Sequence, residues 1–403
     1  MVFMFSKRTF FLIVLFSSLV LMFLYLNTPW LFQTSIITHL HWQNINKSDR
    51  YQYKEAVLTS SSVRNATGKT KNNEASKNTS TSRHKEATTV KTSTSSVNVT
   101  CQRGYVQDRV KRLIPGFDIH AHLFLEPGYR TWKEFERMKR TGYPYGMAGT
   151  GDIIDSVLKM LPAAGKRDRF GERDEVCRRC ILVGSSGVSL GKNVGSQIDK
   201  YDVVIRMNDA KVENYEADVG KKTTFRFIYP ESAAPVANRS VYETNTDIAF
   251  LVYKPNDIRW LEAVLKKEDP RKTDMKFGNS VPGVMTTPAK QVRLVSPRLH
   301  VEARDQFLSA KKRPSCGYVA LVMALHYCDH VDITGYGFDP KVPVHYFKGR
   351  DQGMPKRGAH SWTDEEQHIL QMLHCGIIEH DLTGHFAKEV KGWEHPSVNC
   401  TRR

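Results

Sequence analysis

Short apolar runs alternate with loops and helical segments across residues 181–334, and this alternation limits the fold more than any other feature. The runs have the length and the apolar content of buried strands, at 181–184, 202–206, 224–229, 248–253, 292–295 and 331–334. Residues 317–327 (GYVALVMALHY) read as a helix that leads into the last run. Strands separated by helices predict an α/β domain with a mostly parallel sheet covered on both faces.

In such a sheet, ligands bind beyond the carboxyl ends of the strands. The loop 184–195 (GSSGVSLGKNVG) leaves the first run at that end, and the loop 335–339 leaves the last run. Backbone amides in a Gly/Ser-rich turn form a concave surface that suits phosphate. The loop is neither a Walker A sequence nor GxGxxG, so a nucleotide-binding loop and an ordinary strand-to-helix turn are both open interpretations.

Two histidines near the C-terminus are candidates for proton transfer. His345 follows the 335–339 loop, and His360 stands just before a predicted helix. That helix is expected to begin with a capping box, with Thr363 as the N-cap and Glu366 at the third helical position. The partial positive charge at a helix N-terminus disfavours the imidazolium form, which suits a general base. The chain has 15 histidines, so a structural role is the competing interpretation.

The N-terminus carries a membrane-anchor pattern. Residues 9–26 contain no charged side chain, and a helix of that length spans about 27 Å, close to the thickness of a bilayer core. Lys7 and Arg8 precede the run, so the positive-inside rule places the tail 1–8 in the cytosol and the rest in the lumen. We predict a transmembrane signal-anchor helix over 9–27 rather than a cleaved signal peptide, because no clean small-residue cleavage site follows.

A stem is expected between the anchor and the folded domain, over 28–100. From about Leu58 its residues are mostly Ser, Thr, Asn and Lys, a composition that cannot offset its ordering entropy and predicts disorder. Asn-x-Ser/Thr sequons mark candidate glycosylation sites at Asn46, Asn65, Asn78, Asn98, Asn238 and Asn399. The whole chain has a net charge of +17, and the domain 101–403 is itself basic, which suits an anionic ligand.

The cysteines agree with a lumenal domain. All 7 lie beyond the stem, in a compartment that permits disulfides. Cys177 and Cys180 form the only CxxC pair in the sequence, so the spacing favours structural disulfides over a zinc site. An odd count leaves at least one thiol free or paired between chains.

Taken together, these segments resemble the eukaryotic sialyltransferase family. The large sialylmotif resembles residues 177–232, and the small one resembles 314–339 (PSCGYVALVMALHYCDHVDITGYGFD). His345-Tyr-Phe347 is similar to the third motif, and His360 with Glu365 five positions later is similar to the very small motif. FIYPES, DIAFLVYKPNDIRWLEAVL and IIEHDLTGHF most resemble the β-galactoside α-2,3-sialyltransferases.

The resemblance implies a single Rossmann-like domain of modified GT-A type. It implies inverting transfer of sialic acid from CMP-N-acetylneuraminic acid to the 3-hydroxyl of a terminal β-galactose on glycoproteins or glycolipids. It also implies a single-pass type II protein of the Golgi membrane with a lumenal catalytic domain, and no nucleic-acid partner is expected. The chain contains no Asp-x-Asp, which fits a transferase that uses no metal or other cofactor.

By the same resemblance, His360 matches the general base and His345 matches the histidine that faces the donor phosphate. Glu365 is expected to support the helix terminus rather than the chemistry. The residues expected to bind the donor are Ser185, Ser186, Asn208, Ser315, Gly317 and Gly337. The cysteines that match family disulfides are Cys180 with Cys328 and Cys101 with Cys177.

Some residues depart from the family pattern. Ser185 stands where Asn is usual, Cys316 replaces Ser or Thr, and Lys211 stands where Pro is common. An α-2,6 or α-2,8 linkage and a non-catalytic, anchored glycan-binding protein are therefore the alternatives. A nicotinamide-dependent oxidoreductase is a further alternative, against which the missing GxGxxG argues. Acceptor contacts are expected in the loops 233–313 and 340–359, whose residues do not name the acceptor.

Overall fold

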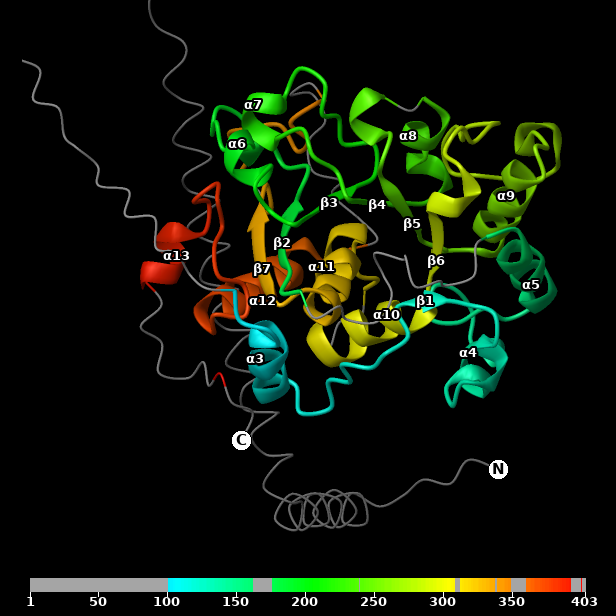
Figure 1. Ribbon diagram of the computed structural model, residues 1–403, viewed down its shortest axis with the longest axis horizontal. Helices are drawn as coiled ribbons and strands as arrows, with labels where there is room; N and C mark the ends of the chain where they lie inside the picture. The colour runs from blue at the N-terminus through cyan, green and yellow to red at the C-terminus, as the bar shows by residue number, and fades with distance from the viewer. Residues whose placement is uncertain are drawn as a thin grey trace, which may run out of the picture. The chain divides into compact units, whose positions relative to one another are not determined.

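In the computed structural model, a 7-stranded sheet has the order β1-β6-β5-β4-β3-β2-β7 (Figure 1). Neighbouring strands are parallel except β1 and β6, which are antiparallel. The strands are β1 (Phe124–Leu125), β2 (Arg179–Val183), β3 (Val203–Met207), β4 (Phe225–Ile228), β5 (Asp247–Phe250), β6 (Val292–Val295) and β7 (His330–Thr334). The structure describes residues 101–161, 176–238, 240–308, 312–337, 339–348, 360–392 and 400.

The expected α/β architecture with a mostly parallel sheet is confirmed, because each predicted run overlaps one of the strands β2 to β7. The bounds of β6 match the prediction, whereas β5 ends three residues earlier than its apolar run, 248–253. Strand β1 was not predicted from the sequence. This strand has only 2 residues, too few to show a hydrophobic period.

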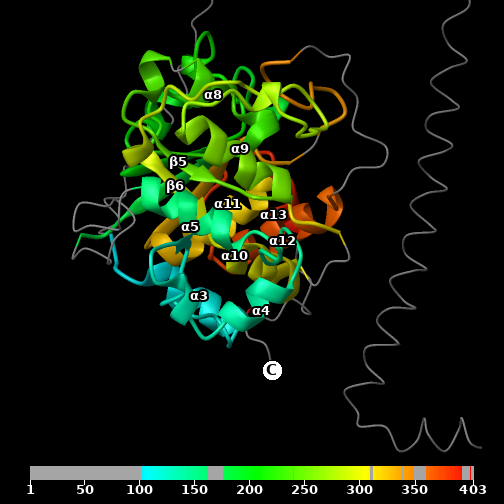
Figure 2. The ribbon, with the colours of Figure 1, turned by 90° about the vertical axis from the view of Figure 1, so that its right-hand side faces the viewer.

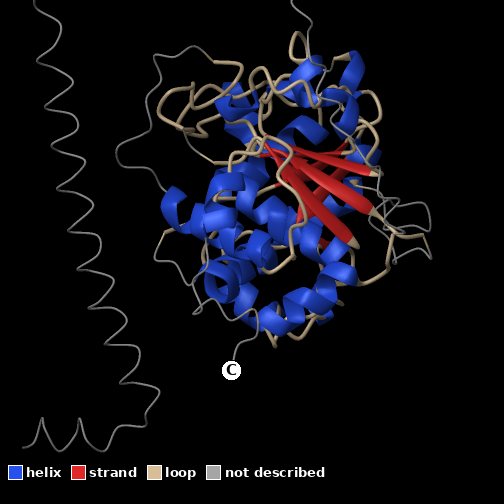
Figure 3. Ribbon diagram, turned by 90° about the vertical axis from the view of Figure 1, so that its left-hand side faces the viewer, coloured by secondary structure: helices blue, strands red, loops and turns tan. Residues whose placement is uncertain are grey.

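Helices cover both faces of the sheet, as Figure 3 shows. Side chains alternate between the faces along each strand, so Cys180 and Leu182 of β2 face one core, and Ile181 and Val183 face another. The first face is covered by α3 (Tyr105–Leu113), α10 (Pro297–Glu302), α11 (Cys316–Tyr327) and α12 (Trp362–His374). The second is covered by α5 (Gly151–Met160) and α9 (Pro255–Leu265), seen with β5 and β6 in Figure 2, and by α6 (Gly195–Ile198) and α7 (Glu216–Val219).

The remaining helices are short. They are α4 (Phe135–Arg140), α8 (Ala234–Ala237), α13 (Ala387–Gly392) and a π-helical segment at Ala303–Leu308. Single turns of 3₁₀ helix lie at Tyr129–Thr131, Gly187–Ser189, Pro230–Ser232, Val241–Glu243, Pro270–Lys272 and Ala289–Gln291.

Helix α11 forms the centre of the larger core. It begins at Cys316, one residue before the predicted helix, and all of its residues are buried except Gly317. A helix that is apolar all round can be stable only when neighbours cover every side. Here the sheet covers one side, and α3, α10 and α12 contribute to the same core. The residues at its N-terminus that line the cavity are therefore attached to a helix that is packed on all sides.

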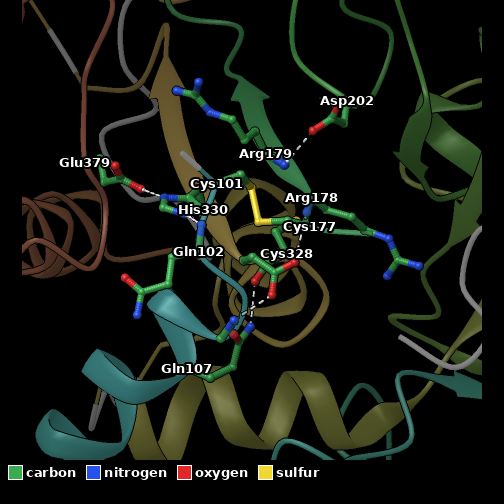
Figure 4. The surroundings of a disulfide bond; sticks show 12 residues. Cys101, Gln102, Gln107, Cys177, Arg178, Arg179, Asp202, Cys328, His330 and Glu379 are labelled. Carbon is green, nitrogen blue, oxygen red and sulfur yellow. Dashed lines mark hydrogen bonds and ion pairs between the residues drawn. A yellow bond between two sulfur atoms is a disulfide. The ribbon is translucent and has the colours of Figure 1, made fainter. Parts of the chain in front are cut away.

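Disulfides tie the segments around β2 together. Both pairs that the resemblance implied are formed: Cys180 of β2 bonds to Cys328 at the end of α11, and Cys101 bonds to Cys177. His330 lies beside the second bond and pairs with Glu379, as Figure 4 shows. The other cysteines comprise the disulfide Cys375–Cys400 and the buried free thiol of Cys316.

Removing the Cys180–Cys328 bond is expected to lower the free energy of unfolding by about 2–5 kcal/mol, because its partners are 148 residues apart. The matched control is Cys375→Ala with Cys400→Ala, whose separation is only 25 residues. On chain-entropy grounds the control should lose about 1.6 kcal/mol less. Urea denaturation of both double variants measures this, and equal losses would contradict the expectation.

Several predictions lie outside the described residues. These are the tail 1–8, the anchor 9–27, the stem 28–100 and the sequons at Asn46, Asn65, Asn78, Asn98 and Asn399. Asn238 is described, and it is exposed at the end of α8. Within the described ranges, none of the helices has the length and apolar character needed to span a membrane.

Candidate active site

The strand order creates a switch point beside β2. The chain runs from β2 outwards through β3, β4, β5 and β6, and then returns to place β7 on the other side of β2. Gly184 leaves β2 and Gly335 leaves β7, and the Gly184 amide donates to the Thr334 carbonyl at 2.7 Å. A Cβ on Gly184 would lie 2.2 Å from the Gly335 carbonyl oxygen, so only glycine permits this approach. Ligands of open α/β sheets bind at such a switch point.

A cavity of about 650 Å³ opens at these strand ends. Its volume lies within the range of small-molecule sites. The structure brings all the predicted catalytic and donor-binding residues to its lining: His345, His360, Ser185, Ser186, Asn208, Ser315, Gly317 and Gly337. These residues come from six places that are separate in the sequence, so their convergence is a property of the fold. Their individual roles stay predictions.

The glycine-rich loop holds the segment that carries His345. The Gly187 amide donates to the Pro343 carbonyl at 3.0 Å, and the Tyr346 amide donates to the Ser185 carbonyl at 3.0 Å. A Cβ on Gly187 would lie 2.2 Å from the Pro343 oxygen, so the glycine is needed for contact between the two backbones. One reason for glycine in this loop is therefore packing against another loop, which the sequence alone did not reveal.

His345 is held by Ser185, the residue that stands where the family usually has Asn. The Ser185 hydroxyl lies 3.0 Å from His345 Nδ1, and Phe347 stacks on the imidazole with a 5.6 Å separation of ring centres. Burial lowers the pKa of His345, and the charge of Lys348 lowers it further. The neutral imidazole is therefore the main form at pH 7. Ser185 contacts Nδ1, so the hydrogen bond to Ser185 does not involve Nε2.

His360 is held in one tautomer by the chain segment before α11. Its Nδ1–H donates to the Arg313 carbonyl at 2.8 Å, because a carbonyl can only accept. Nε2 then carries the lone pair. Burial lowers the pKa of His360, and the positive charge of Arg313 contributes in the same direction. A neutral imidazole with a lone pair on a nitrogen at the cavity suits a general base.

The pH dependence of the rate is expected to follow from this pKa. Protonation of His360 removes the base, and its pKa lies below 6.5, so kcat/KM should stay high from pH 8 down to about 6.5 and fall at lower pH. The measurement is kcat/KM between pH 4.5 and 8 at constant ionic strength. A midpoint of the acid limb above 6.5 would contradict the assignment.

The predicted capping box is wrong. Helix α12 begins at Trp362 with Ser361 as its N-cap, so Thr363 already lies inside the helix. Glu366 turns away to lie 3.4 Å from His385 Nε2. The sequence pattern failed because Glu365, the neighbouring carboxylate, faces the core and fixes how the helix is placed.

Glu365 supports α11 rather than its own helix. Its carboxylate accepts the Ser315 amide at 2.7 Å and the Ser315 hydroxyl at 2.5 Å. Ser315 in turn caps α11 by accepting the Tyr318 amide at 3.1 Å. Burial raises the pKa of Glu365 to about 7. This chain of bonds joins the helix that follows His360 to the N-terminus of α11, where Ser315 and Gly317 are predicted to bind the donor.

Asn208 has an unsatisfied polar atom at the cavity. It follows β3 with a left-handed backbone (φ 54°), a conformation that asparagine tolerates well. Its carbonyl accepts from Arg226, which is paired with the buried Glu243. Its Oδ1 is buried and has no hydrogen-bond partner among the described residues. A bound ligand with a hydroxyl or amino donor would satisfy this oxygen.

Several residues that line the cavity were not predicted from the sequence: Tyr229, Glu231, Tyr253, Lys254, Arg313 and Trp362. Tyr229 follows β4 directly, and Tyr253 lies three residues beyond β5. The rule that ligands bind beyond the carboxyl ends of strands would have selected both tyrosines. Trp362 is 40% exposed, and the centre of its ring lies 5.4 Å from the centre of the His360 ring. No periodic pattern marks Arg313 or Trp362.

Comparison with known proteins agrees with this geometry. The sequence pattern of glycosyltransferase family 29 (sialyltransferase) matches residues 126–377. The CMP-N-acetylneuraminate-beta-1,4-galactoside alpha-2,3-sialyltransferase of Mus musculus is 30% identical over 291 residues, which cover 69% of this chain and 76% of that protein. The lactosylceramide alpha-2,3-sialyltransferase of Homo sapiens is 31% identical over 273 residues, 64% of each chain.

Solved structures show the same relationship. The crystal structure of a mammalian sialyltransferase has a TM-score of 0.56 and 25% sequence identity, and the match covers 70% of this chain and 97% of that one. A second structure, in complex with Gal-beta-1-3GalNAc-ortho-nitrophenol, gives a TM-score of 0.56 at 26% identity and covers 98% of that chain. The protein therefore belongs to the sialyltransferase family, glycosyltransferase family 29.

Proposed function

We propose that the protein transfers sialic acid from CMP-sialic acid to the 3-hydroxyl of a terminal β-galactose, with inversion. The observation that carries the proposal is the presence of His345 and His360 in the lining of one cavity, together with every predicted donor-binding residue. Relatives named for α-2,3 transfer to galactosides support the linkage and the acceptor class.

The reaction needs one proton transfer and one stabilised leaving group. Nε2 of His360 takes the proton of the galactose 3-hydroxyl as that oxygen attacks C2 of the sialic acid. The bond between C2 and the phosphate oxygen breaks, and CMP leaves with its electron pair. In the tautomer in which Ser185 donates to Nδ1 of His345, Nε2–H of His345 donates to the phosphate and stabilises the departing charge.

Metal independence and membrane anchoring are parts of the same proposal. The sequence has no Asp-x-Asp with which to bind a metal-bound nucleotide sugar, and two histidines supply the base and the phosphate contact. The uncharged run at 9–26 and the sequons support a type II protein of the Golgi membrane, with residues 101–403 as the lumenal catalytic domain.

The test is release of CMP from CMP-sialic acid by the purified protein, with lactose, Gal-β1,3-GalNAc or lactosylceramide as acceptor. We expect release that depends on the acceptor, persists in EDTA and gives a product cleaved by an α-2,3-selective sialidase. A product that resists this sialidase would contradict the linkage. Glycan binding with no turnover on any acceptor would contradict the enzymatic proposal, and loss of activity in EDTA would contradict metal independence.

A further inference from the structure

Arg313 places a positive charge in the cavity, and no described residue forms an ion pair with it. The residue lines the cavity, and its Nε is buried with no hydrogen-bond partner among the described residues. The carboxylates of the same lining are engaged elsewhere: Glu365 accepts from Ser315, Glu231 pairs with Lys254, and Glu366 lies against His385. A partly buried cation without a counter-charge is costly, so this site favours a ligand that brings a negative charge.

The guanidinium is held in a defined position. Its central carbon lies 4.7 Å from the centre of the Tyr253 ring, a distance at which an arginine is attracted to an aromatic face. Tyr253 is itself packed edge-on against Tyr229 at 5.2 Å and against His300 at 5.1 Å. The aromatic support reduces the number of side-chain conformations that Arg313 would lose when it binds a ligand.

Arg313 belongs to the end of the cavity where the proton is transferred. Its carbonyl accepts Nδ1–H of His360 at 2.8 Å, so its backbone contacts the proposed base directly. His345, which is proposed to face the phosphate, is instead held by Ser185. The two histidines therefore have two different proposed roles in one cavity. Arg313 belongs with His360, the proposed base, and not with His345.

CMP-sialic acid carries two kinds of negative charge, the phosphate and the carboxylate on C1. The carboxylate is bonded to C2, the carbon attacked by the acceptor oxygen, so it must lie close to the base that activates this oxygen. We propose that Arg313 binds the C1 carboxylate of the donor and so orients C2 for attack. This inference rests on the proposed function. An arginine fork suits it, because guanidinium and carboxylate form paired, charge-assisted hydrogen bonds.

The test compares two ligands that differ by the sialic acid. Arg313→Met in the full-length, detergent-solubilised protein should weaken binding of CMP-sialic acid by about 10- to 100-fold, as loss of a charge-assisted bond predicts. Binding of CMP, which lacks the carboxylate, should be unchanged, which also shows that the variant folds. Titration calorimetry without acceptor gives both dissociation constants, and Arg313→Lys should recover part of the loss.

Lys312→Met is the matched control, because it removes the same charge from the neighbouring exposed residue, which does not line the cavity. It should bind both ligands as the wild type does. Equal weakening of CMP and CMP-sialic acid in Arg313→Met would make Arg313 a phosphate contact and overturn the inference. Unchanged donor binding with a raised KM for the galactoside would overturn it in favour of an acceptor contact. Failure of the proposed function can be told apart from failure of this inference, because the wild-type protein would then not bind CMP-sialic acid at all.

Discussion

Replacing His360 with alanine is expected to lower kcat by about 10²–10⁴-fold, the usual contribution of a general base. The substitution removes the proposed base for the acceptor hydroxyl, and it leaves the proposed phosphate contact of His345 in place. Binding of CMP should therefore be unchanged. Steady-state transfer from CMP-sialic acid to lactose gives kcat, and titration with CMP reports donor-site integrity.

The control for this variant is His374→Ala, which removes an exposed histidine at the end of the same helix, α12. It should keep the wild-type rate. A His360→Ala protein with the wild-type kcat, or one whose loss of rate is matched by His374→Ala, would remove His360 from the mechanism.

Replacing His345 with alanine is the second large expected effect, with kcat lowered by about 10²–10³-fold. This is the usual result of removing one preorganised donor from a group on which negative charge develops. His345 is fixed by the Ser185 hydroxyl and by stacking with Phe347, so no solvent reorganisation is needed when the phosphate departs. Single-turnover transfer at saturating donor separates this chemical step from product release.

His345→Gln provides the matched comparison, because the amide keeps a hydrogen-bond donor without the ring. It should recover part of the lost rate. If His345→Ala and His345→Gln both raised the KM for the acceptor and left kcat unchanged, the residue would act on the acceptor and not on the leaving group.

Much of the fold could be predicted because buried parallel strands leave a simple mark in sequence. A strand covered on both faces is apolar throughout, as Ile181–Val183 shows, so its approximate position follows from residue type. The carboxyl-end rule then placed the loops that follow Val183 and Thr334 at one site. Both inferences depend on local sequence and on the geometry of a parallel sheet alone.

The missed parts depend on contacts between distant segments. Glu365 leaves its own helix terminus because Ser315, 50 residues earlier, offers it two hydrogen bonds in the core. Arg313 joins the site through a carbonyl contact to His360 that no residue type can signal. The packing of Gly187 against Pro343 is likewise a tertiary event. A sequence pattern describes one segment at a time, whereas each of these features is a contact between two segments that are distant in the sequence.

The most direct test of the central claim is a crystal structure of His360→Ala with CMP-sialic acid and a galactoside bound. We expect the phosphate beside His345, and the galactose 3-hydroxyl between the vacated imidazole position and C2 of the sialic acid. A nucleotide sugar bound away from the cavity beside Asn208 would contradict the proposed mechanism. An acceptor hydroxyl positioned beside another side chain that can accept its proton would contradict the mechanism as well.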